Sequence, residues 1–477
     1  MAIVLPASAA AEAPTFAAAV NYAAGDGPTS VSVGDLNGDG TLDLAVAFRG
    51  RDCCINPGGV SVLLGNGDGT FLSAVNFEAG LGPAAVAIAD LNGDGNPDLA
   101  VANTTSSDVS VLLGNSDGSF QAAVDYDAGF GPRSLSVADL NGDGTPDLAV
   151  ANAFSDDVSV LLGNGDGSFQ PADAYGAGAS PSSVAVGDAN GDSNPDLVTA
   201  NALSDDVSVL LGNGDGSFQP PANYFAGEFP SSVAISDLNG DGNLDLAVTT
   251  DFASVLLGNG DGSFQPPVNH SAGQVPFSVA VVDVNGDGNP DLAVANLFSD
   301  NVSVLVGEGD GSFEAALNFG VHTRPFSLAD GDLNGDGKPD LAVASLDTND
   351  VSVLLNTTAA AVDVFVAIKP GSDSHPINPR ASGVIPVAIL STASFDATSV
   401  DPASVCFGDA DDPSQRDCTE AHNTGHVQDV NGDGRLDLLL HFDGAETGID
   451  PDDTTACLTA KTFGAVDVEG CDSITIV

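Results

Sequence analysis

Short apolar runs alternate along this chain with clusters of Gly, Asn and Asp. In one unit, Ser134–Ala138 alternates apolar and polar residues, Asp147–Ala151 and Val158–Leu162 are largely apolar, and a weaker run extends to Tyr175. Short runs bounded by turn residues predict β-strands joined by tight hairpins. No extended stretch carries helical periodicity. Each unit therefore predicts four antiparallel strands.

This unit recurs seven times. A nine-residue pattern, Asp-x-Asn-x-Asp-x-x-x-Asp, marks the loop between the first and second strands of each copy. It begins at Asp35, Asp90, Asp139, Asp188, Asp237, Asp283 and Asp332, at intervals of 46 to 55 residues, and an eighth copy begins at Asp429. Four strands repeated at such a period predict the blades of an all-β, seven-bladed propeller.

The two ends of the repeat region are complementary. The seventh unit reaches Val351–Leu355 and then lacks its fourth strand, whereas Phe16–Tyr22 matches Phe71–Phe77, which precedes the second unit. We therefore expect an N-terminal strand to complete the last blade and close the ring, which leaves only short edges exposed. An open solenoid with a frayed end is the alternative.

The repeat ends before residue 362, where different alternating runs begin, among them Ile385–Leu390. The expected organisation is an N-terminal tail or signal-peptide remnant (1–15), the propeller (16–357), a linker (358–361) and a smaller β-sandwich-like domain (362–477).

The net charge of the chain limits the kinds of partner that it could bind. The chain has 67 Asp and Glu against 10 Lys and Arg, a formal net charge of -57. Nucleic acid and anionic membranes would be repelled. No apolar run reaches the length of a membrane span, so no membrane insertion is expected.

Six cysteines indicate export from the cytosol. Cys406, Cys418, Cys457 and Cys471 lie in the C-terminal region, and proximity favours the pairs Cys406–Cys418 and Cys457–Cys471 among three possible connectivities. Adjacent Cys53 and Cys54 could form a vicinal disulfide or bridges to other blades or molecules, and the sequence does not decide.

The repeated pattern is also a cation loop. Positions 1, 3, 5 and 9 offer oxygen side chains, position 7 offers a main-chain carbonyl, and Gly at position 6 permits the sharp turn, so that about eight Ca²⁺ sites are expected. A strand follows position 9 and position 12 lacks Glu, which excludes an EF-hand; ordinary hairpin turns are the alternative. Ser193 replaces the sixth-position Gly in one loop and predicts strain there. The expected ligands are Asp35, Asn37, Asp39, Thr41, Asp43, Asp90, Asn92, Asp94, Asn96, Asp98, Asp139, Asn141, Asp143, Thr145, Asp147, Asp188, Asn190, Asp192, Asn194, Asp196, Asp237, Asn239, Asp241, Asn243, Asp245, Asp283, Asn285, Asp287, Asn289, Asp291, Asp332, Asn334, Asp336, Lys338, Asp340, Asp429, Asn431, Asp433, Arg435 and Asp437.

These loops, together with turns such as Gly163–Phe169, resemble the FG-GAP/VCBS repeats of bacterial surface proteins and the calcium-binding blades of the integrin alpha-subunit propeller. The resemblance covers about residues 16 to 357. It implies a seven-bladed propeller, structural Ca²⁺ and roles in adhesion or ligand binding, at the surface of or outside a bacterial cell. Ile368–Gly371 and Ile377–Pro379 look like an accessory domain found at the ends of bacterial secreted proteins.

Loop length varies on the face opposite the cation loops: residues 48–59 hold an insertion, and the loop after Thr250 is short. Arg49, Arg51, Arg133 and Arg324 map to this face and could bind a carboxylate or sulfate on a protein or glycan ligand. Local neutralisation of nearby Asp residues is the alternative.

The sequence favours a non-catalytic, extracellular calcium-binding adhesion or ligand-binding protein. One alternative is a structural subunit of a surface layer or filament, which would form homo-oligomers. A calcium-dependent polysaccharide lyase is a second, although no catalytic group stands out from the carboxylates of the loops.

Overall fold

The computed structural model describes residues 13–50, 57–358, 362–363, 365–368, 376–377, 384–390, 397–400, 402–409, 426–428, 435–443, 455–461, 467–473 and 475–476. The chain divides into two compact units: Pro14–Val284 with Asn289–Thr357, and Met1–Ala13, Asn285–Gly288 and Thr358–Val477. Residues 1–12 of the expected tail and 359–361 of the expected linker lie outside the described residues. Within the described ranges, no helix is long and apolar enough to cross a membrane.

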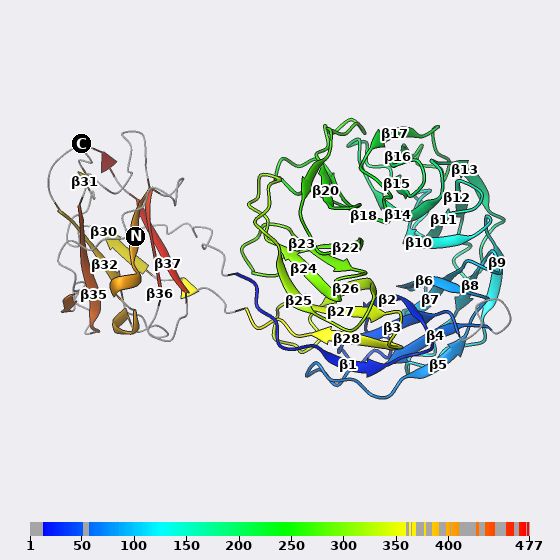
Figure 1. Ribbon diagram of the computed structural model, residues 1–477, viewed down its shortest axis with the longest axis horizontal. Helices are drawn as coiled ribbons and strands as arrows, with labels where there is room; N and C mark the ends of the chain where they lie inside the picture. The colour runs from blue at the N-terminus through cyan, green and yellow to red at the C-terminus, as the bar shows by residue number, and fades with distance from the viewer. Residues whose placement is uncertain are drawn as a thin grey trace. The chain divides into compact units, whose positions relative to one another are not determined.

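Seven four-stranded antiparallel sheets form a ring of blades, as predicted (Figure 1). The first, innermost strands are β2 (Pro28–Gly34), β6 (Pro83–Ala89), β10 (Pro132–Ala138), β14 (Pro181–Gly187), β18 (Ser232–Ser236), β22 (Pro276–Val282) and β26 (Pro325–Gly331). The second strands are β3 (Asp43–Phe48), β7 (Asp98–Asn103), β11 (Asp147–Asn152), β15 (Asp196–Asn201), β19 (Asp245–Thr249), β23 (Asp291–Asn296) and β27 (Asp340–Ser345).

The third strands are β4 (Gly59–Leu63), β8 (Asp108–Leu112), β12 (Asp157–Leu161), β16 (Asp206–Leu210), β20 (Ala253–Leu256), β24 (Asn301–Leu305) and β28 (Asp350–Leu354). The outermost strands are β5 (Val75–Glu78), β9 (Val124–Asp127), β13 (Asp173–Gly176), β17 (Ala222–Phe225), β21 (Val268–His270), β25 (Leu317–Gly320) and β1 (Val20–Ala23).

The core lies between adjacent blades. Second strands such as β11 are buried along their whole length because both faces of each sheet pack on a neighbouring sheet, so both sets of alternating side chains are apolar or small. In one cluster, Ala100 and Ala102 of one blade pack with Leu148 and Val150 of the next. Each fully buried Leu or Val contributes about 1.5–3 kcal/mol relative to an exposed one.

An aromatic contact crosses every blade interface. A ring on the outermost strand of one blade meets, edge to face, a Phe of the next blade, with centroids 4.9–5.7 Å apart. The pairs are Tyr22–Phe71, Phe77–Phe120, Tyr126–Phe169, Tyr175–Phe218, Tyr224–Phe264, His270–Phe313 and Phe319–Phe16. Phe16, before the first strand, supplies the last pair, so this aromatic ring includes both ends of the propeller.

The predicted closure is present. Strand β1 pairs antiparallel with β28, with Val20 opposite Val353, and completes the seventh sheet. A further bridge joins Phe16 to Asn356. The strand itself starts later than the predicted Phe16, because residues 17–19 lie outside the regular ladder.

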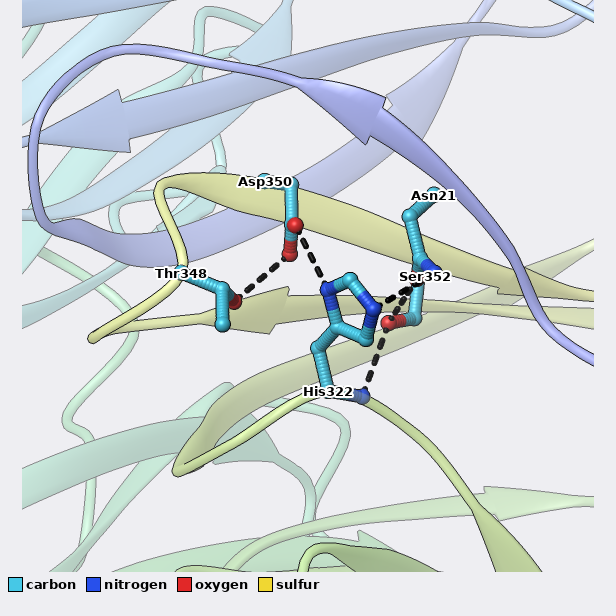
Figure 2. A network of polar contacts seen from close by, with 5 residues as sticks. All are labelled: Asn21, His322, Thr348, Asp350 and Ser352. Carbon is cyan, nitrogen blue, oxygen red and sulfur yellow. Dashed lines mark hydrogen bonds and ion pairs between the residues drawn. The ribbon is translucent and has the colours of Figure 1, made fainter.

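A polar network at this closure involves His322 (Figure 2). Its Nδ1 lies 2.6 Å from Asp350 Oδ2, and its Nε2 lies 2.8 Å from Asn21 Nδ2 on β1. Asn21 Oδ1 in turn accepts a hydrogen bond of 2.7 Å from Ser352. The histidine thus ties the N-terminal strand to the last blade.

His322 occupies a position that is Gly in the other six blades. There a side chain is excluded: a Cβ added to Gly178 would lie 2.5 Å from Nδ2 of Asn201 on the second strand. In the seventh blade the matching second-strand residue is the smaller Ser345, so the imidazole has room. His322 then contacts Asp350 much as Asn201 contacts Asp206 in its own blade.

The C-terminal unit consists of β-sheets and two short 3-10 turns. One sheet has the order β29 (Val362–Asp363), β37 (Asp467–Ser473), β36 (Thr455–Lys461) and β33 (Cys406–Asp409), and a second has β30 (Phe365–Ile368), β32 (Val384–Leu390), β35 (Asp437–Asp443) and β34 (His426–Gln428). A two-stranded sheet joins β31 (Pro376–Ile377) to β38 (Thr475–Ile476), and the turns are Ala397–Ser399 and Pro402–Ser404. Phe407 and Phe442, one from each large sheet, are fully buried with ring centroids 5.3 Å apart, as in a sandwich core.

Candidate functional site

The predicted cation loops share one geometry, in which carboxylates accept main-chain hydrogen bonds. In the loop that starts at Asp139, its Oδ1 accepts from the amides of Gly142 (2.8 Å) and Asp143 (3.1 Å), and its Oδ2 accepts from Gly144 (2.8 Å). Asn141 Oδ1 accepts from the Asp143 amide at 2.8 Å. These hydrogen bonds hold positions 1, 3 and 5 of the loop close to one another.

Six of the seven described fifth-position aspartates are exposed, and Asp287 is half-buried. Asp143 Oδ1 accepts hydrogen bonds from the amide of Thr145 at 2.8 Å and from its hydroxyl. These hydrogen bonds lower the pKa of Asp143, because they favour the charged carboxylate. The loop therefore keeps this group ionised.

The ninth-position aspartates have a second role that the sequence did not suggest. Asp147 is fully buried at the start of β11; its Oδ2 accepts from the Leu140 amide at 2.9 Å and its Oδ1 from the Gly163 amide at 2.7 Å. Gly163 begins the turn between the third and fourth strands. The carboxylate therefore fastens the cation loop to that turn, and the same pair of bonds recurs at Asp43, Asp98, Asp196, Asp245, Asp291 and Asp340.

Burial raises the pKa of six of these carboxyls, namely Asp43, Asp98, Asp147, Asp196, Asp245 and Asp340. For Asp340 the pKa rises to about 6, and the charges of Asp336 and Asp332 in the same loop add to this rise. An uncompensated negative charge is therefore costly here. A bound cation would offset that cost.

The donor set fits a hard cation, because the described loops offer carboxylate, amide, hydroxyl and main-chain oxygens. Each carboxylate oxygen that accepts one hydrogen bond retains capacity for a second partner. Within the described ranges, no three Asp, Glu, His or Cys side chains are gathered closely enough to hold a metal alone. A cation would therefore need the Asn and main-chain oxygens as well.

Two loops depart from the pattern. Ser193 has a left-handed backbone, with φ of 70°, which is unfavourable without Gly and agrees with the strain expected there. Of the eighth loop, Asp429, Asn431 and Asp433 lie outside the described residues. Arg435 is exposed, and Asp437 is buried at the start of β35.

The glycine-rich turns between third and fourth strands lie on this same side, which we name the cation-loop face. They are turns, as predicted: Asp166 Oδ1 accepts from the amide (3.0 Å) and hydroxyl (2.5 Å) of Ser168. Gly167, with φ of 81°, packs on the previous blade, since an added Cβ would lie 2.7 Å from Leu113.

The opposite side, which we name the variable-loop face, carries a pocket of about 310 Å³ at the mouth of the central channel. It is lined by Thr29, Ser30, Arg49, Gly82, Ala84, Ala85, Thr104, Thr105, Arg133, Ser134, Ser182, Ser183, Ser231, Ser232, Phe277, Ser278, Phe326 and Ser327. These residues come from the starts of all seven inner strands and from two second-to-third loops. Every blade thus contributes to one site.

The structure brings two of the four predicted arginines into this pocket, Arg49 and Arg133. Arg324 lies outside its lining and contacts Asp347 at 3.3 Å and the Phe298 ring at 6.0 Å, so for this residue local pairing is observed. Arg51 lies outside the described residues.

Phe277 and Phe326 in the pocket wall were not singled out from the sequence. Their rings lie 4.2 Å apart, and the Arg49 guanidinium lies 5.3 Å from the Phe326 ring. Both sit next to the proline that begins an inner strand, where the other blades have small or polar residues or Arg133. That local difference between repeats was the available signal.

The predicted disulfides remain predictions. Antiparallel pairing of β36 and β37 sets Cys457 opposite Cys471, the arrangement that their proposed bond requires. Cys406 lies on β33, whereas Cys418, Cys53 and Cys54 fall outside the described residues.

Solved structures with similar folds include BBS1N in complex with ARL6DN, in crystals soaked with mercury or lead. Each is 15% identical with a TM-score of 0.49; the matches cover 72% and 71% of this chain and 97% and 96% of the other. A protein from Lactobacillus plantarum is 19% identical with a TM-score of 0.48, covering 63% of this chain and 86% of the other. No curated protein matches the chain.

The sequence itself matches repeat-family models throughout the propeller. The FG-GAP-like repeat model matches residues 53–101, 90–150, 139–199, 188–248, 237–294 and 283–343, and the FG-GAP repeat model matches residues 27–63. These matches cover more than half of the 477 residues. The chain belongs to the FG-GAP repeat family.

Proposed function

We propose that this chain is a non-catalytic, calcium-stabilised binding module that works outside the cell and engages a protein or glycan ligand through its variable-loop face. The observation that carries the proposal is the pocket to which all seven blades contribute, on the face where loop lengths differ. Constant scaffolds with variable loops commonly bind ligands through those loops.

Exposed apolar side chains around this face support a binding role. Phe130, Phe154, Leu203, Phe229 and Phe298 are 55–69% exposed and lie on second-to-third loops or on connections between blades. Isolated exposed apolar residues are common, but several on one rim are typical of an interaction surface. The described pocket lining offers no carboxylate or imidazole for proton transfer, which is why binding is proposed over lyase chemistry.

Binding is tested with an array of acidic and neutral glycans and a panel of purified extracellular proteins. The wild-type chain is compared with a variant that carries Phe154→Ser, Leu203→Ser and Phe298→Ser, and with a control in an exposed turn of the cation-loop face, Glu308→Gln. Specific binding that the triple variant loses and the control keeps is the expected result. Absence of any ligand, or equal binding by the triple variant, would refute the proposal.

In the proposed calcium sites, carboxylate, Asn and main-chain oxygens of each loop would hold the ion, whose charge would offset the mutual repulsion of the Asp side chains. Thermal unfolding with excess Ca²⁺ and with chelator tests this. At 100 times the dissociation constant, each site that binds only the folded state adds about 2.7 kcal/mol. An unchanged melting temperature on chelation would mean that the loops are turns.

A further inference from the structure

The pocket at the channel mouth differs in charge from the rest of the molecule. The chain has 67 acidic and 10 basic residues, yet the described lining of the pocket holds Arg49 and Arg133 and no Asp or Glu. Most of the other lining residues are serine or threonine. Two arginines and a lining rich in hydroxyls, in so acidic a chain, are complementary to an oxyanion.

A ring of hydroxyl groups strengthens this complementarity. Serines at one position of six inner strands accept a hydrogen bond from an amide of the adjacent blade, at 3.2–3.4 Å. They are Ser30, Ser134, Ser183, Ser232, Ser278 and Ser327. Within the described residues these hydroxyls have no recorded acceptor for their own proton. Their oxygens are fixed while their protons remain available to an anion in the pocket.

The pocket is also partly apolar. The paired rings of Phe277 and Phe326 form one wall, and the Arg49 guanidinium lies over Phe326. A stacked guanidinium keeps its planar face on the ring, and its five N–H donors allow a ligand carboxylate to bind in addition to the other contact that Arg49 makes within the chain. One ligand could therefore place its acidic group at Arg49 and an apolar group against the rings.

The rim of the pocket carries side chains at positions that disfavour them. The residue before the proline at or just before the start of each inner strand is left-handed, and it is Gly in the first three blades and Ser180 in the fourth. Phe229, Val275 and Arg324 occupy it in later blades, with φ of 53°, 56° and 59°. For a β-branched or bulky residue this conformation is a clear outlier, and such strain is typical of functional sites. Phe229 is nevertheless 62% exposed, so packing does not explain its presence.

The proposed function leaves protein and glycan ligands open, and the rim favours protein. The chain has no Trp, and all four of its Tyr residues belong to the aromatic contacts between blades. The exposed rim residues are Phe, Leu and Val, which suit an apolar protein surface. The basic pocket inside that rim suits one acidic group.

We propose, on the basis of the proposed binding function, that this pocket binds a segment of a partner protein that presents a carboxylate flanked by aromatic or aliphatic side chains. Arg49 and Arg133 bind the carboxylate, helped by the serine ring. Phe277, Phe326 and the rim residue Phe229 contact the apolar side chains of the segment.

The test uses the full chain and two fluorescent peptides, capped at both ends, with the sequences Gly-Phe-Asp-Phe-Leu-Gly and Gly-Phe-Asn-Phe-Leu-Gly. A glucuronate oligosaccharide forms a third arm. We expect the Asp peptide to bind with a dissociation constant of ~1 mM or tighter. The Asn peptide should bind at least ~10-fold more weakly, since its amide cannot accept charge-assisted hydrogen bonds from the arginines. Equal binding of the two peptides, no binding of either, or binding of the oligosaccharide alone would overturn the inference.

Two variants locate the site. Arg49→Gln combined with Arg133→Gln should reduce binding of the Asp peptide at least ~10-fold, whereas Glu308→Gln, in an exposed glycine-rich turn on the cation-loop face, should not. Phe229→Gly should raise the melting temperature by relieving strain and yet weaken peptide binding, opposite effects that a purely structural residue would not produce. Unchanged binding in both variants would overturn the pocket assignment. If ligands found on the glycan array or protein panel were still lost by the Phe154, Leu203 and Phe298 triple variant, the proposed binding function would stand and only the carboxylate inference would fail.

Discussion

At the scale of single residues, the ninth-position aspartates combine two roles. Asp147 is expected to be a calcium ligand, and it also accepts main-chain hydrogen bonds from Leu140 and Gly163 in the protein interior. Exposed Asp143, in the same loop, accepts hydrogen bonds from Thr145 and Asn141 of that loop and does not join the loop to the turn. The two residues can therefore separate the structural from the cation-binding contribution.

With chelator present, Asp147→Asn should lower the free energy of unfolding by about 1–3 kcal/mol, because the amide nitrogen faces a main-chain N–H that then lacks an acceptor. Asp143→Asn should have little effect under the same conditions but should reduce the stabilisation by added Ca²⁺. Denaturant unfolding measures both. Equal effects of the two substitutions in chelator would contradict the fastening role of Asp147.

His270 is the one non-Phe, non-Tyr ring in the aromatic contacts between blades. It meets Phe313 at 5.2 Å, its buried Nε2 has no partner within the described residues, and burial lowers its pKa. A depressed histidine pKa means that the unfolded chain binds more protons, so the contribution of His270 is complete above pH ~6.5 and is lost as pH falls below it.

His270→Tyr should therefore stabilise the propeller more at pH ~5 than at pH ~8. The tyrosine restores the ring used at neighbouring interfaces, where Tyr224 donates a hydrogen bond to the Gly262 carbonyl. Melting temperatures across this pH range measure the effect, with Phe225→Ala, on an exposed outer-strand residue, as a control. The idea fails if His270→Tyr gives the same increment at both pH values.

At the scale of elements, His322 and Ser345 act as a compensating pair. His322→Gly removes the hydrogen bonds to Asp350 and Asn21, and Ser345→Asn places a larger side chain against the imidazole. Each single substitution should cost about 1–3 kcal/mol, whereas the double variant recreates the Gly and Asn combination of other blades and should recover most of that loss.

A double-mutant cycle by chemical denaturation measures the coupling between the two positions. Thr323→Ala, at an exposed neighbouring position, serves as the control. Strictly additive losses would show that the two positions do not compensate each other.

The elements themselves were largely predictable from the sequence, because seven copies of one pattern reinforce each other. The blades, the closing strand and the cation loops follow from that period. The pocket could not be predicted in this way. Ser134 and Ser183 look like ordinary polar positions of a strand, and they line one channel only because the blades close into a ring. The burial of Asp147 was also hidden, since its partner Gly163 comes from a separate turn.

At the scale of the whole molecule, charge opposes the compact state. With 67 acidic and 10 basic residues, self-repulsion should destabilise the folded chain when no divalent cation is bound. Raising monovalent salt to ~1 M shortens the Debye length to about 3 Å and should raise the melting temperature in chelator.

Sodium and choline chloride should act alike, since screening depends on ionic strength and not on the identity of the cation. A melting temperature that falls with salt would contradict the prediction. With Ca²⁺ bound, the dependence on salt should be weaker, because part of the negative charge is then neutralised.

The pairing of β1 with β28 also has a consequence for how the chain folds. Val20 meets Val353 across almost the entire length of the repeat region, so the final ladder cannot form until the last blade has been synthesised. Closing so long a loop carries a large entropic cost and places the contact among those expected to form late. Until then Phe319 lacks its partner Phe16, and the seventh blade presents an unpaired edge at which another chain could add a strand. A nascent propeller of this kind is most exposed to association with its neighbours in the interval between completing its last blade and capturing its first strand.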